Sequence, residues 1–404
     1  MKIKDIIGNE NFCPAPWIHA VVTPRGSVRP CNDFSMYVDR ITSTQNFHDT
    51  YNSSVIKDVR TSIINDKVHP GCASCREKEK RVGYCKRNSL LNGIKYWGIE
   101  ETELDIESPT KNVIWLDIRL SNACNLKCRH CYPVLSSAWK GDAGKLREME
   151  IGEYIKDVVE YKLNEKYELS RDIVVDVSKG VGQLRRLEFK GGEPLIRQDL
   201  IEDFIRNMNY DLKEIQIDII SNGTVKMKDS LMELLNECKL LKMDFSVEAG
   251  EKMFNYIRGI SLEDLKETIF GISRNVAPSR IGFRITQMVY NIFEYPNAHR
   301  WIKGLNLKEQ LSGIFIHNYV VHPKFLNVLN LPLDIRLEAQ QVLSDFIVDN
   351  ECDETVYKLK NTLGKPQIKE NVDLLKSYTK NLDEVRGVSL LDVEPRIGRY
   401  IYDQ

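Results

Sequence analysis

The chain has 404 residues, 42% of them hydrophobic, which is enough to bury the core of an enzyme of two or three domains. Its formal net charge of −1 provides no overall field that favours nucleic acid or an anionic membrane surface. The N-terminus lacks the apolar run of a signal peptide, and no run of about eighteen apolar residues predicts a membrane span. We therefore expect a cytoplasmic protein.

Ten cysteines in a reducing compartment favour metal ligands or buried thiols over disulfides, and eight of the ten lie in the first third of the chain. In residues 1–104, Cys13 and Cys31 enclose a glycine with the spacing Cys-x12-Gly-x4-Cys, which predicts two strands joined by a turn. Cys72 and Cys75 follow as a Cys-x2-Cys pair. Four thiolates in this pairing hold one [4Fe–4S] cluster or one zinc ion, and the residues alone leave both open.

Residues 105–320 alternate short β-rich runs with amphipathic helical runs, which is typical of βα units that form a parallel sheet. The predicted strands are 113–120, 184–190, 213–220, 242–247, 281–290 and 313–317. Six strands with intervening helices predict an α/β fold, a partial (β/α)6 TIM-type barrel. Residues 321–404 are predicted as a helical C-terminal tail punctuated by prolines.

Cys124, Cys128 and Cys131 lie within eight residues, shortly after the predicted strand 113–120. Three thiolates on a flexible loop can hold three irons of a [4Fe–4S] cluster and leave the fourth iron open for chemistry. Zinc is the alternative, although closed zinc sites use four ligands in paired short spacings. The charged stretch 140–172 follows as a predicted helical insertion.

Polar and glycine-rich turns follow the later predicted strands. After the second strand, two glycines let the backbone approach a ligand, and a glutamate and a proline follow them. Polar side chains also end the next two strands, the edge at which parallel sheets bind ligands. A later arginine suits bidentate pairing with a carboxylate. These residues are Gly191, Gly192, Glu193, Pro194, Ser221, Asn222, Ser246, Glu248 and Arg258.

Together with these turns, the Cys-x3-Cys-x2-Cys loop resembles the signature of the radical S-adenosylmethionine (SAM) superfamily, which follows the first strand of a partial α/β barrel. The resemblance implies a [4Fe–4S] cluster on Cys124, Cys128 and Cys131, with SAM bound at the open iron. The family usually places an aromatic residue against the adenine, just before the third cysteine. This chain has His130 there, followed by Tyr132, so a flat ring is kept.

The same resemblance implies roles for the turns in binding SAM. The Gly-Gly-Glu-Pro turn at 191–194 matches the turn that holds the amino group of SAM, and the Ser-Asn turn at 221–222 is similar to one near its carboxylate and ribose. Ser246 and Glu248 stand where relatives carry Ser-x-Asp, so the ribose contact of Glu248 departs from the usual aspartate. Arg258 is similar to the arginine that pairs with the SAM carboxylate.

The front cysteines resemble the twitch and SPASM modules that carry auxiliary [4Fe–4S] clusters in this superfamily. Those modules normally follow the barrel, whereas this one precedes it. The four ligands Cys13, Cys31, Cys72 and Cys75 imply one auxiliary cluster, as in the shorter twitch type. Cys85 is left open as an alternative ligand, a hydrogen-atom donor or a plain thiol.

The function implied by the resemblance is reductive cleavage of SAM to a 5′-deoxyadenosyl radical that abstracts a substrate hydrogen, with electrons from a flavodoxin or ferredoxin type of carrier. We expect modification of a ribosomal peptide or protein. The alternative is a dehydrogenase of a small alcohol or sugar-like metabolite, and the alternative from another class is a zinc-binding scaffold without enzymatic activity. The sequence identifies no catalytic acid or base.

Overall fold

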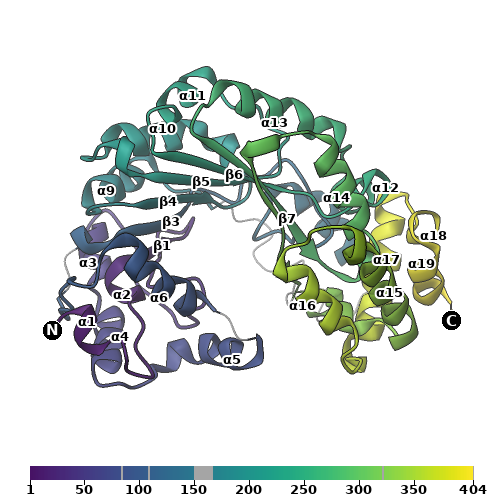
Figure 1. Cartoon of the computed structure of the whole chain (residues 1–404), viewed down its shortest axis with the longest axis horizontal. Coiled ribbons are helices and arrows are strands. Elements are labelled where there is room, and N and C mark those ends of the chain that lie inside the picture. Colours follow the sequence, from purple (N-terminus) through teal and green to yellow (C-terminus); the bar gives the residue numbers. More distant parts are fainter. Residues whose placement is uncertain (83–84, 108–109, 150–166, 321–322, 404) are drawn as a thin grey trace. The chain divides into compact units, whose positions relative to one another are not determined.

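The computed structural model describes residues 1–82, 85–107, 110–149, 167–320 and 323–403 (Figure 1). The described chain divides into two compact units. The first comprises Met1–Ser121, Tyr167–Ile219 and Lys228–Leu241, and the second comprises Asn122–Lys166, Ile220–Met227 and Lys242–Gln404. The domain boundaries at residues 104 and 320 stay a prediction.

The strands of the first unit lie side by side in the order β2, β1, β3, β4, β5. Their bounds are β1 His19–Val22, β2 Val28–Arg29, β3 Trp115–Arg119, β4 Arg186–Lys190 and β5 Gln216–Ser221. β1 and β2 form the predicted hairpin between the first two cysteines, and Gly26 in its turn has a φ of 76°, which favours glycine. The other neighbours pair in parallel, so β1 of the front segment extends the sheet of the βα units.

Apolar side chains on alternate positions of these strands pack beneath helices α9 (Arg171–Gly180) and α10 (Gln198–Asn207), which lie along one side of the sheet in Figure 1. The ring of Phe189 on β4 contacts that of Phe204 on α10, with centroids 5.8 Å apart. The apolar face of α10 is buried as its spacing predicts. The remaining helices of this unit are α1 Ile3–Ile6, α2 Ala15–Ile18, α3 Phe47–Tyr51, α4 Ser54–Ile64, α5 Ala73–Val82, α6 Lys86–Trp97 and α11 Asp229–Leu235.

The second unit contains the later βα units and the tail. Its strands follow in the order β6 (Leu240–Ser246), β7 (Ser279–Gln287) and β8 (Leu311–Tyr319), and β7 and β8 pair in parallel. Its helices are α7 Lys140–Arg147, α12 Glu251–Arg258, α13 Glu263–Asn275, α14 Tyr295–Gly304, α15 Leu333–Asp349, α16 Glu354–Leu363, α17 Val372–Arg386, α18 Leu390–Val393 and α19 Pro395–Tyr402. The prediction of a helical tail is confirmed.

Strands alternate with helices in chain order, and the pairs β3–β4, β4–β5 and β7–β8 are parallel, which confirms the predicted α/β class and is consistent with a partial TIM-type barrel. All six predicted strands are present. The predicted helical insertion 140–172 is described only in part, since residues 150–166 lie outside the described ranges.

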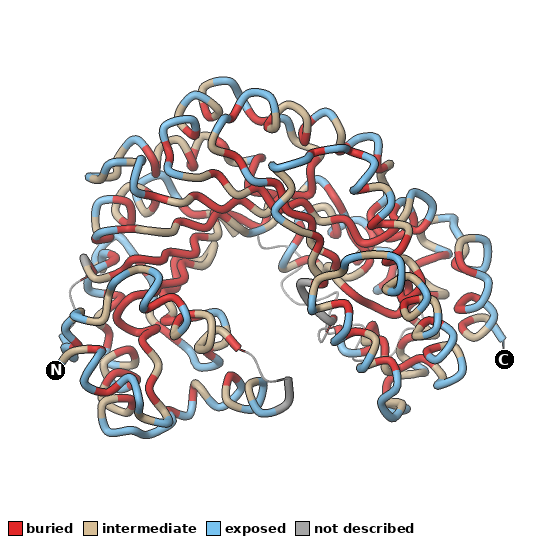
Figure 2. The backbone as a smooth tube through the Cα atoms, in the orientation of Figure 1, coloured by how far each residue is buried: buried red, intermediate tan, exposed pale blue. Residues whose placement is uncertain are grey.

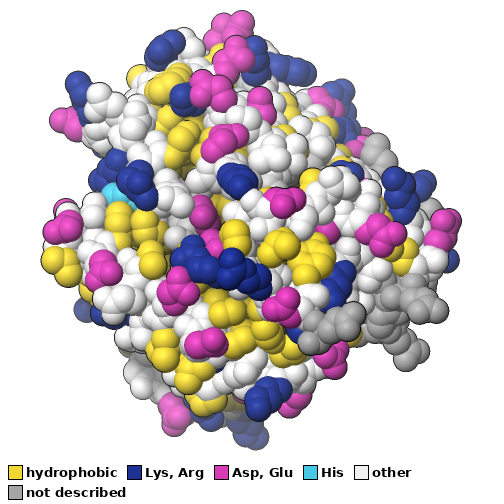
Figure 3. Space-filling model, turned by 90° about the vertical axis from the view of Figure 1, so that its right-hand side faces the viewer, with side chains coloured by type: hydrophobic (Ala, Val, Ile, Leu, Met, Phe, Trp, Pro, Cys, Tyr) yellow, Lys and Arg dark blue, Asp and Glu magenta, His cyan; other side chains and the backbone are white. Residues whose placement is uncertain are grey.

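Buried residues concentrate along the strands, as the red segments of Figure 2 show. On the face drawn in Figure 3, basic and acidic side chains are interspersed, in keeping with 57 basic and 58 acidic residues. In the described ranges, every helix is too short or too polar to cross a membrane.

Candidate functional site

The loop after β3 places three thiols together in the second unit. Cys128 is buried, whereas Cys124 and Cys131 are half-buried. The Cys131 thiol donates a hydrogen bond to Cys128, and the Arg258 guanidinium lies 3.5 Å from the Cys128 sulfur. The hydrogen bond and the neighbouring positive charge lower the pKa of Cys128 to about 7. This environment favours the thiolate, which is the form that binds iron.

These three thiols fit a [4Fe–4S] cluster that is held at three corners. The fourth cysteine of this unit, Cys352, instead forms a hydrogen bond with Tyr295. A cube held by three thiolates keeps one iron available to another ligand.

The predicted Ser-Asn turn meets the cysteine loop. The side-chain amide of Asn222 donates to Asn125 Oδ1 at 3.0 Å and lies 3.8 Å from the Cys124 sulfur. Asn125 in turn donates to the Thr224 hydroxyl at 2.7 Å, while the Ser221 hydroxyl accepts from the amide of residue 223. The structure therefore brings Asn222 to the first cysteine, through direct side-chain contacts with the loop.

Glu248 and Arg258, which the sequence places ten residues apart, form a buried bidentate pair. Both guanidinium nitrogens Nε and Nη2 donate to the carboxylate, and both side chains are at most 5% exposed. The Asn291 amide donates to the Glu248 carbonyl at 3.0 Å. Because Nη1 of the same arginine faces Cys128, the Glu248 carboxylate fixes the guanidinium beside that sulfur.

The two rings predicted next to the third cysteine, Cys131, belong to His130 and Tyr132. His130 is half-buried, and burial of its ring lowers its pKa to about 4, which keeps the imidazole neutral at pH 7. Tyr132, also half-buried, opens the turn that leads to α7. Ser246 is the last residue of β6, two residues before Glu248.

The Gly-Gly-Glu-Pro turn lies in the first unit, directly after β4. Gly191 has a φ of 134°, and a Cβ there would lie 2.5 Å from the carbonyl oxygen of Ser121. The next amide, of Gly192, donates to that same oxygen at 2.9 Å. The buried Glu193 carboxylate accepts from the amide of residue 195 at 3.1 Å and caps a short helical turn that begins with Pro194. The turn is a tight, preformed backbone cradle.

Replacing Gly191 with alanine is expected to lower the free energy of unfolding by about 2 kcal/mol or more, because the methyl group meets backbone oxygen and the φ is one that side chains disfavour. The matched control is Gly271→Ala in α13, where no atom lies near the added methyl group and the helix gains about 0.5–1 kcal/mol. Urea unfolding of both variants measures this. Equal stability of the two variants would contradict the cradle geometry.

The four front cysteines line one pocket in the first unit. Cys13, Cys31, Cys72 and Cys75 share it with cationic side chains that include Lys86. Burial raises the pKa of the first three thiols to about 12, so without a metal they stay protonated, and metal binding must displace their protons. Four converging thiols with cations around them fit one four-iron cluster. No three His, Cys, Asp or Glu side chains in the described ranges are spaced to hold a single metal ion.

Cys85, the cysteine left over from the pairing, is buried beside this pocket rather than among its lining residues. It accepts a hydrogen bond from the Cys75 thiol and donates one to Asn88 Oδ1 at 3.1 Å. The bond from Cys75 lowers the pKa of Cys85 to about 6.

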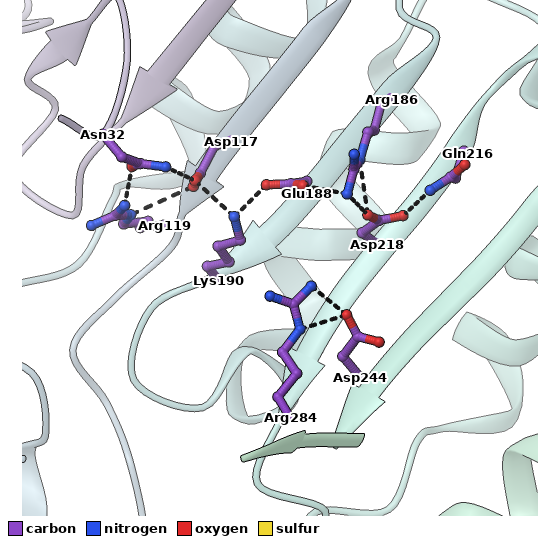
Figure 4. Close-up of polar contacts among 10 residues, drawn as sticks. All are labelled: Asn32, Asp117, Arg119, Arg186, Glu188, Lys190, Gln216, Asp218, Asp244 and Arg284. Atoms are coloured by element: carbon purple, nitrogen blue, oxygen red, sulfur yellow. Dashed lines mark hydrogen bonds and ion pairs between the residues drawn. The ribbon is translucent and has the colours of Figure 1, made fainter. Parts of the chain in front are cut away.

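The side of the sheet opposite α10 carries a network of charged side chains that sequence reasoning missed (Figure 4). Lys190 bridges the buried carboxylates of Asp117 and Glu188, and Arg186 bridges those of Glu188 and Asp218. The network continues to three further side chains, Asn32, Arg119 and Gln216. In the second unit, Figure 4 also shows a separate pair of Asp244 and Arg284.

A signal for this network is present in the sequence. Charges at alternate positions of the apolar strands, such as Asp117 and Arg119 or Glu188 and Lys190, predict one polar face on a sheet. The register then aligns Asp117, Glu188 and Asp218 across three neighbouring strands.

Two family models match this chain. Residues 118–277 match the radical SAM superfamily, and residues 13–76 match an iron–sulfur cluster-binding domain, SPASM. The two matched ranges contain all seven cysteines of the two groups described above.

Among curated proteins, GTP 3′,8-cyclase of Syntrophomonas wolfei is 26% identical over 228 residues, which cover 55% of this chain and 58% of that protein. GTP 3′,8-cyclase of Paenarthrobacter nicotinovorans is 32% identical over 111 residues, which cover 26% of this chain and 25% of that protein. The chain thus spans less than two thirds of the length of these relatives.

Among solved structures, anSMEcpe with bound AdoMet is 15% identical with a TM-score of 0.38, covering 62% of each chain. SuiB of Streptococcus suis bound to its precursor peptide SuiA is 15% identical with a TM-score of 0.36, covering 76% of this chain and 68% of that one.

Proposed function

This chain belongs to the radical SAM superfamily and carries a SPASM-type iron–sulfur module ahead of its βα units; on that premise, we propose that it oxidises a polar substrate, a peptide or protein in the first place, by hydrogen abstraction. The cofactors that these families imply are SAM, a [4Fe–4S] cluster that binds it and an auxiliary cluster. When bound, SAM and its cluster supply a 5′-deoxyadenosyl radical. The protein residues bind and orient the substrate and SAM, and they exclude water from the site.

The cluster that binds SAM is assigned to Cys124, Cys128 and Cys131, which are gathered on one loop beside the fixed charge of Arg258. We propose that SAM is bound by the residues named from the sequence, with Asn222 and the Glu248–Arg258 pair in the second unit. From the sequence resemblance, we also propose that the backbone of the 191–194 turn contacts SAM. The neutral His130 ring suits contact with a flat adenine.

The proposal that the substrate is oxidised rests on the position of the charged network within the first unit. At one end, Lys86 lines the pocket of the four front cysteines and lies 3.2 Å from the centre of the Trp115 ring on β3. Lys190, in the middle of the network, is the last residue of β4 and immediately precedes the glycine turn assigned to SAM. A substrate on this face has the auxiliary site on one side and the SAM turn on the other. In this proposal the auxiliary cluster accepts an electron from the substrate as the substrate is oxidised.

The charges of the network favour a substrate without a large net charge. Three cationic side chains are each paired with a carboxylate of the network, the set being Asp117, Glu188, Asp218, Arg119, Arg186 and Lys190, and Lys86 over the Trp115 ring adds one further cation. A nucleoside triphosphate, the substrate indicated by the names of the curated relatives, needs an excess of cationic donors. We therefore do not propose GTP as the substrate.

A peptide comes first because the network extends across three strands, about 10 Å at the usual strand spacing. That length matches about three extended peptide residues, whose backbone offers donors and acceptors in alternation. A small alcohol or sugar-like metabolite is the second candidate, since its hydroxyls also both donate and accept. Either reaction needs a low-potential electron donor, for which we propose a carrier of the flavodoxin or ferredoxin type.

Deuterium transfer tests the proposal without a known substrate. Cells grown in deuterated water are separated into a peptide and a small-metabolite fraction, and each is incubated with reduced, cluster-loaded protein and SAM. Deuterium in 5′-deoxyadenosine with the peptide fraction supports the first candidate, and deuterium with the metabolite fraction supports the second. Unlabelled 5′-deoxyadenosine with both fractions would contradict hydrogen abstraction from either class. Cys128→Ala protein is the control for background cleavage.

A further inference from the structure

The C-terminal tail reaches the cysteine loop through helix α17 (Val372–Arg386). The Tyr378 hydroxyl donates to the carbonyl of Arg129 at 2.7 Å, and the Arg386 guanidinium donates to the carbonyl of Lys127. Between them, the indole of Trp139 donates to the Cys128 carbonyl at 3.0 Å. Three successive carbonyls around the second cysteine are therefore each held by a side chain, two of them from the tail.

A buried ion pair fixes the same loop. Arg129 is fully buried, pairs with Asp383 of α17, and lies with its guanidinium carbon 3.6 Å from the centre of the Tyr256 ring. Its backbone amide donates to the carbonyl of Ile257 at 2.9 Å, so this N–H points away from the cysteine sulfurs. A buried pair with a stacked ring holds one geometry, because either charge alone would be costly to bury.

Asp383 is satisfied by several donors besides Arg129. The hydroxyls of Tyr256 and Tyr402 donate to it at 2.9 and 2.6 Å, and the amide of Leu390 donates at 2.8 Å. Tyr402 and Leu390 belong to the last two helices of the chain. The end of the chain is thus tied to the loop through a single carboxylate.

The outer edge of the loop has a second tie. Asp142 of α7 accepts from Lys127 at 2.7 Å and from Arg386 at 2.8 Å. The guanidinium of Arg386 therefore contacts the carbonyl of Lys127 and also the Asp142 carboxylate, which pairs with the Lys127 ammonium group.

We propose that Tyr378, Asp383 and Arg386 are positioning residues that set the geometry of the Cys124–Cys131 loop and thereby the reduction potential of the cluster it holds. The inference rests on the proposed function for the identity of that cluster. Hydrogen bonds to the sulfurs and access of water influence the potential of such clusters. Releasing the loop admits water and frees amides toward the sulfurs, which stabilises the more negative, reduced cluster. The potential then rises.

The test compares two variants on one helix that each remove one buried hydroxyl. Tyr378→Phe removes the bond to the loop and keeps the ring packed on Phe325. Thr379→Val removes a hydrogen bond to Tyr290 that involves no atom of the loop, and it keeps the Tyr290 ring 5.9 Å from the Arg129 guanidinium. Asp383→Asn is a second variant of similar shape. After anaerobic reconstitution, iron content, melting temperature and the midpoint potential of the cluster whose EPR signal responds to SAM are measured.

The expected result for Tyr378→Phe is a higher midpoint potential and about tenfold slower formation of 5′-deoxyadenosine, as for other residues that orient metal ligands. Thr379→Val should lower the melting temperature by a similar amount, and its midpoint potential and its rate of 5′-deoxyadenosine formation should equal those of the wild type. Equal potentials in Tyr378→Phe, Asp383→Asn and wild type would overturn the inference while leaving the proposed function intact. Wild-type protein that binds no iron would overturn the proposed function itself, and the inference with it.

Discussion

Replacing Cys128 with alanine is expected to abolish the formation of 5′-deoxyadenosine and to reduce bound iron by about half, from roughly eight to four atoms per chain. Cys128 is the buried thiol of the loop, it accepts a hydrogen bond from Cys131, and it faces Arg258. With one thiolate lost, two ligands remain for that cluster. Iron analysis and chromatographic detection of 5′-deoxyadenosine measure the effect.

The matched control for this variant is Cys238→Ala. Cys238 is also buried, at 5% exposure, but it follows helix α11 in the first unit and belongs to neither group of clustered cysteines. Losing its small apolar side chain is expected to leave iron content and SAM cleavage unchanged. Loss of 5′-deoxyadenosine in both variants alike would mean that Cys128 acts through stability alone and would contradict its role as a ligand.

Replacing Lys190 with methionine is expected to lower the free energy of unfolding by about 3 kcal/mol at pH 7, because it removes the cation that bridges two buried carboxylates. Burial alone raises the pKa of Glu188, but the charges of Lys190 and Arg186 outweigh burial and bring that pKa below its usual value. Burial likewise raises the pKa of Asp117, and the charges of Lys190 and Arg119 bring it below its usual value.

The pH dependence of this loss has a definite sign. A carboxylate with a lowered folded pKa contributes stability above its unfolded pKa, and that stability is lost as pH falls toward the folded pKa. The difference between wild type and Lys190→Met should therefore be full at pH 7 and shrink below about pH 4. Urea unfolding over this range measures it. Lys266→Met, at an exposed pair with Glu263, is the control and should change stability by less than about 0.5 kcal/mol.

Much of the fold was predictable because its signals are local. Each predicted strand is a short β-rich run, and each corresponds to an observed strand within a few residues. The buried face of α10 follows from the helical period of its apolar residues. The hairpin of β1 and β2 follows from the glycine between two β-rich runs.

The pairing of β1 with β3 was not predictable from these local signals. About ninety residues separate the two strands in the sequence, and no periodicity encodes which edge of a sheet a distant strand joins.

Within the candidate site, the residue types were predictable but their partners were not. Cysteine spacing and the Gly-Gly-Glu-Pro turn identify the candidate ligands. The pairing of Glu248 with Arg258 depends on how α12 turns back toward the end of β6. The ion pair of Asp383 with Arg129 depends on packing of α17 against the cysteine loop. The tail was predicted as helical with no assigned chemistry, because a tyrosine and an aspartate in an amphipathic helix carry no motif. Their role emerges only from contacts with the loop.

The most direct test of the central claim is metal analysis of anaerobically purified wild-type protein, followed by incubation with dithionite and SAM. We predict roughly eight irons with matching sulfide per chain, and 5′-deoxyadenosine as a product of SAM cleavage. Zinc in place of iron, with SAM left intact, would contradict the account and identify the chain as a zinc-binding scaffold.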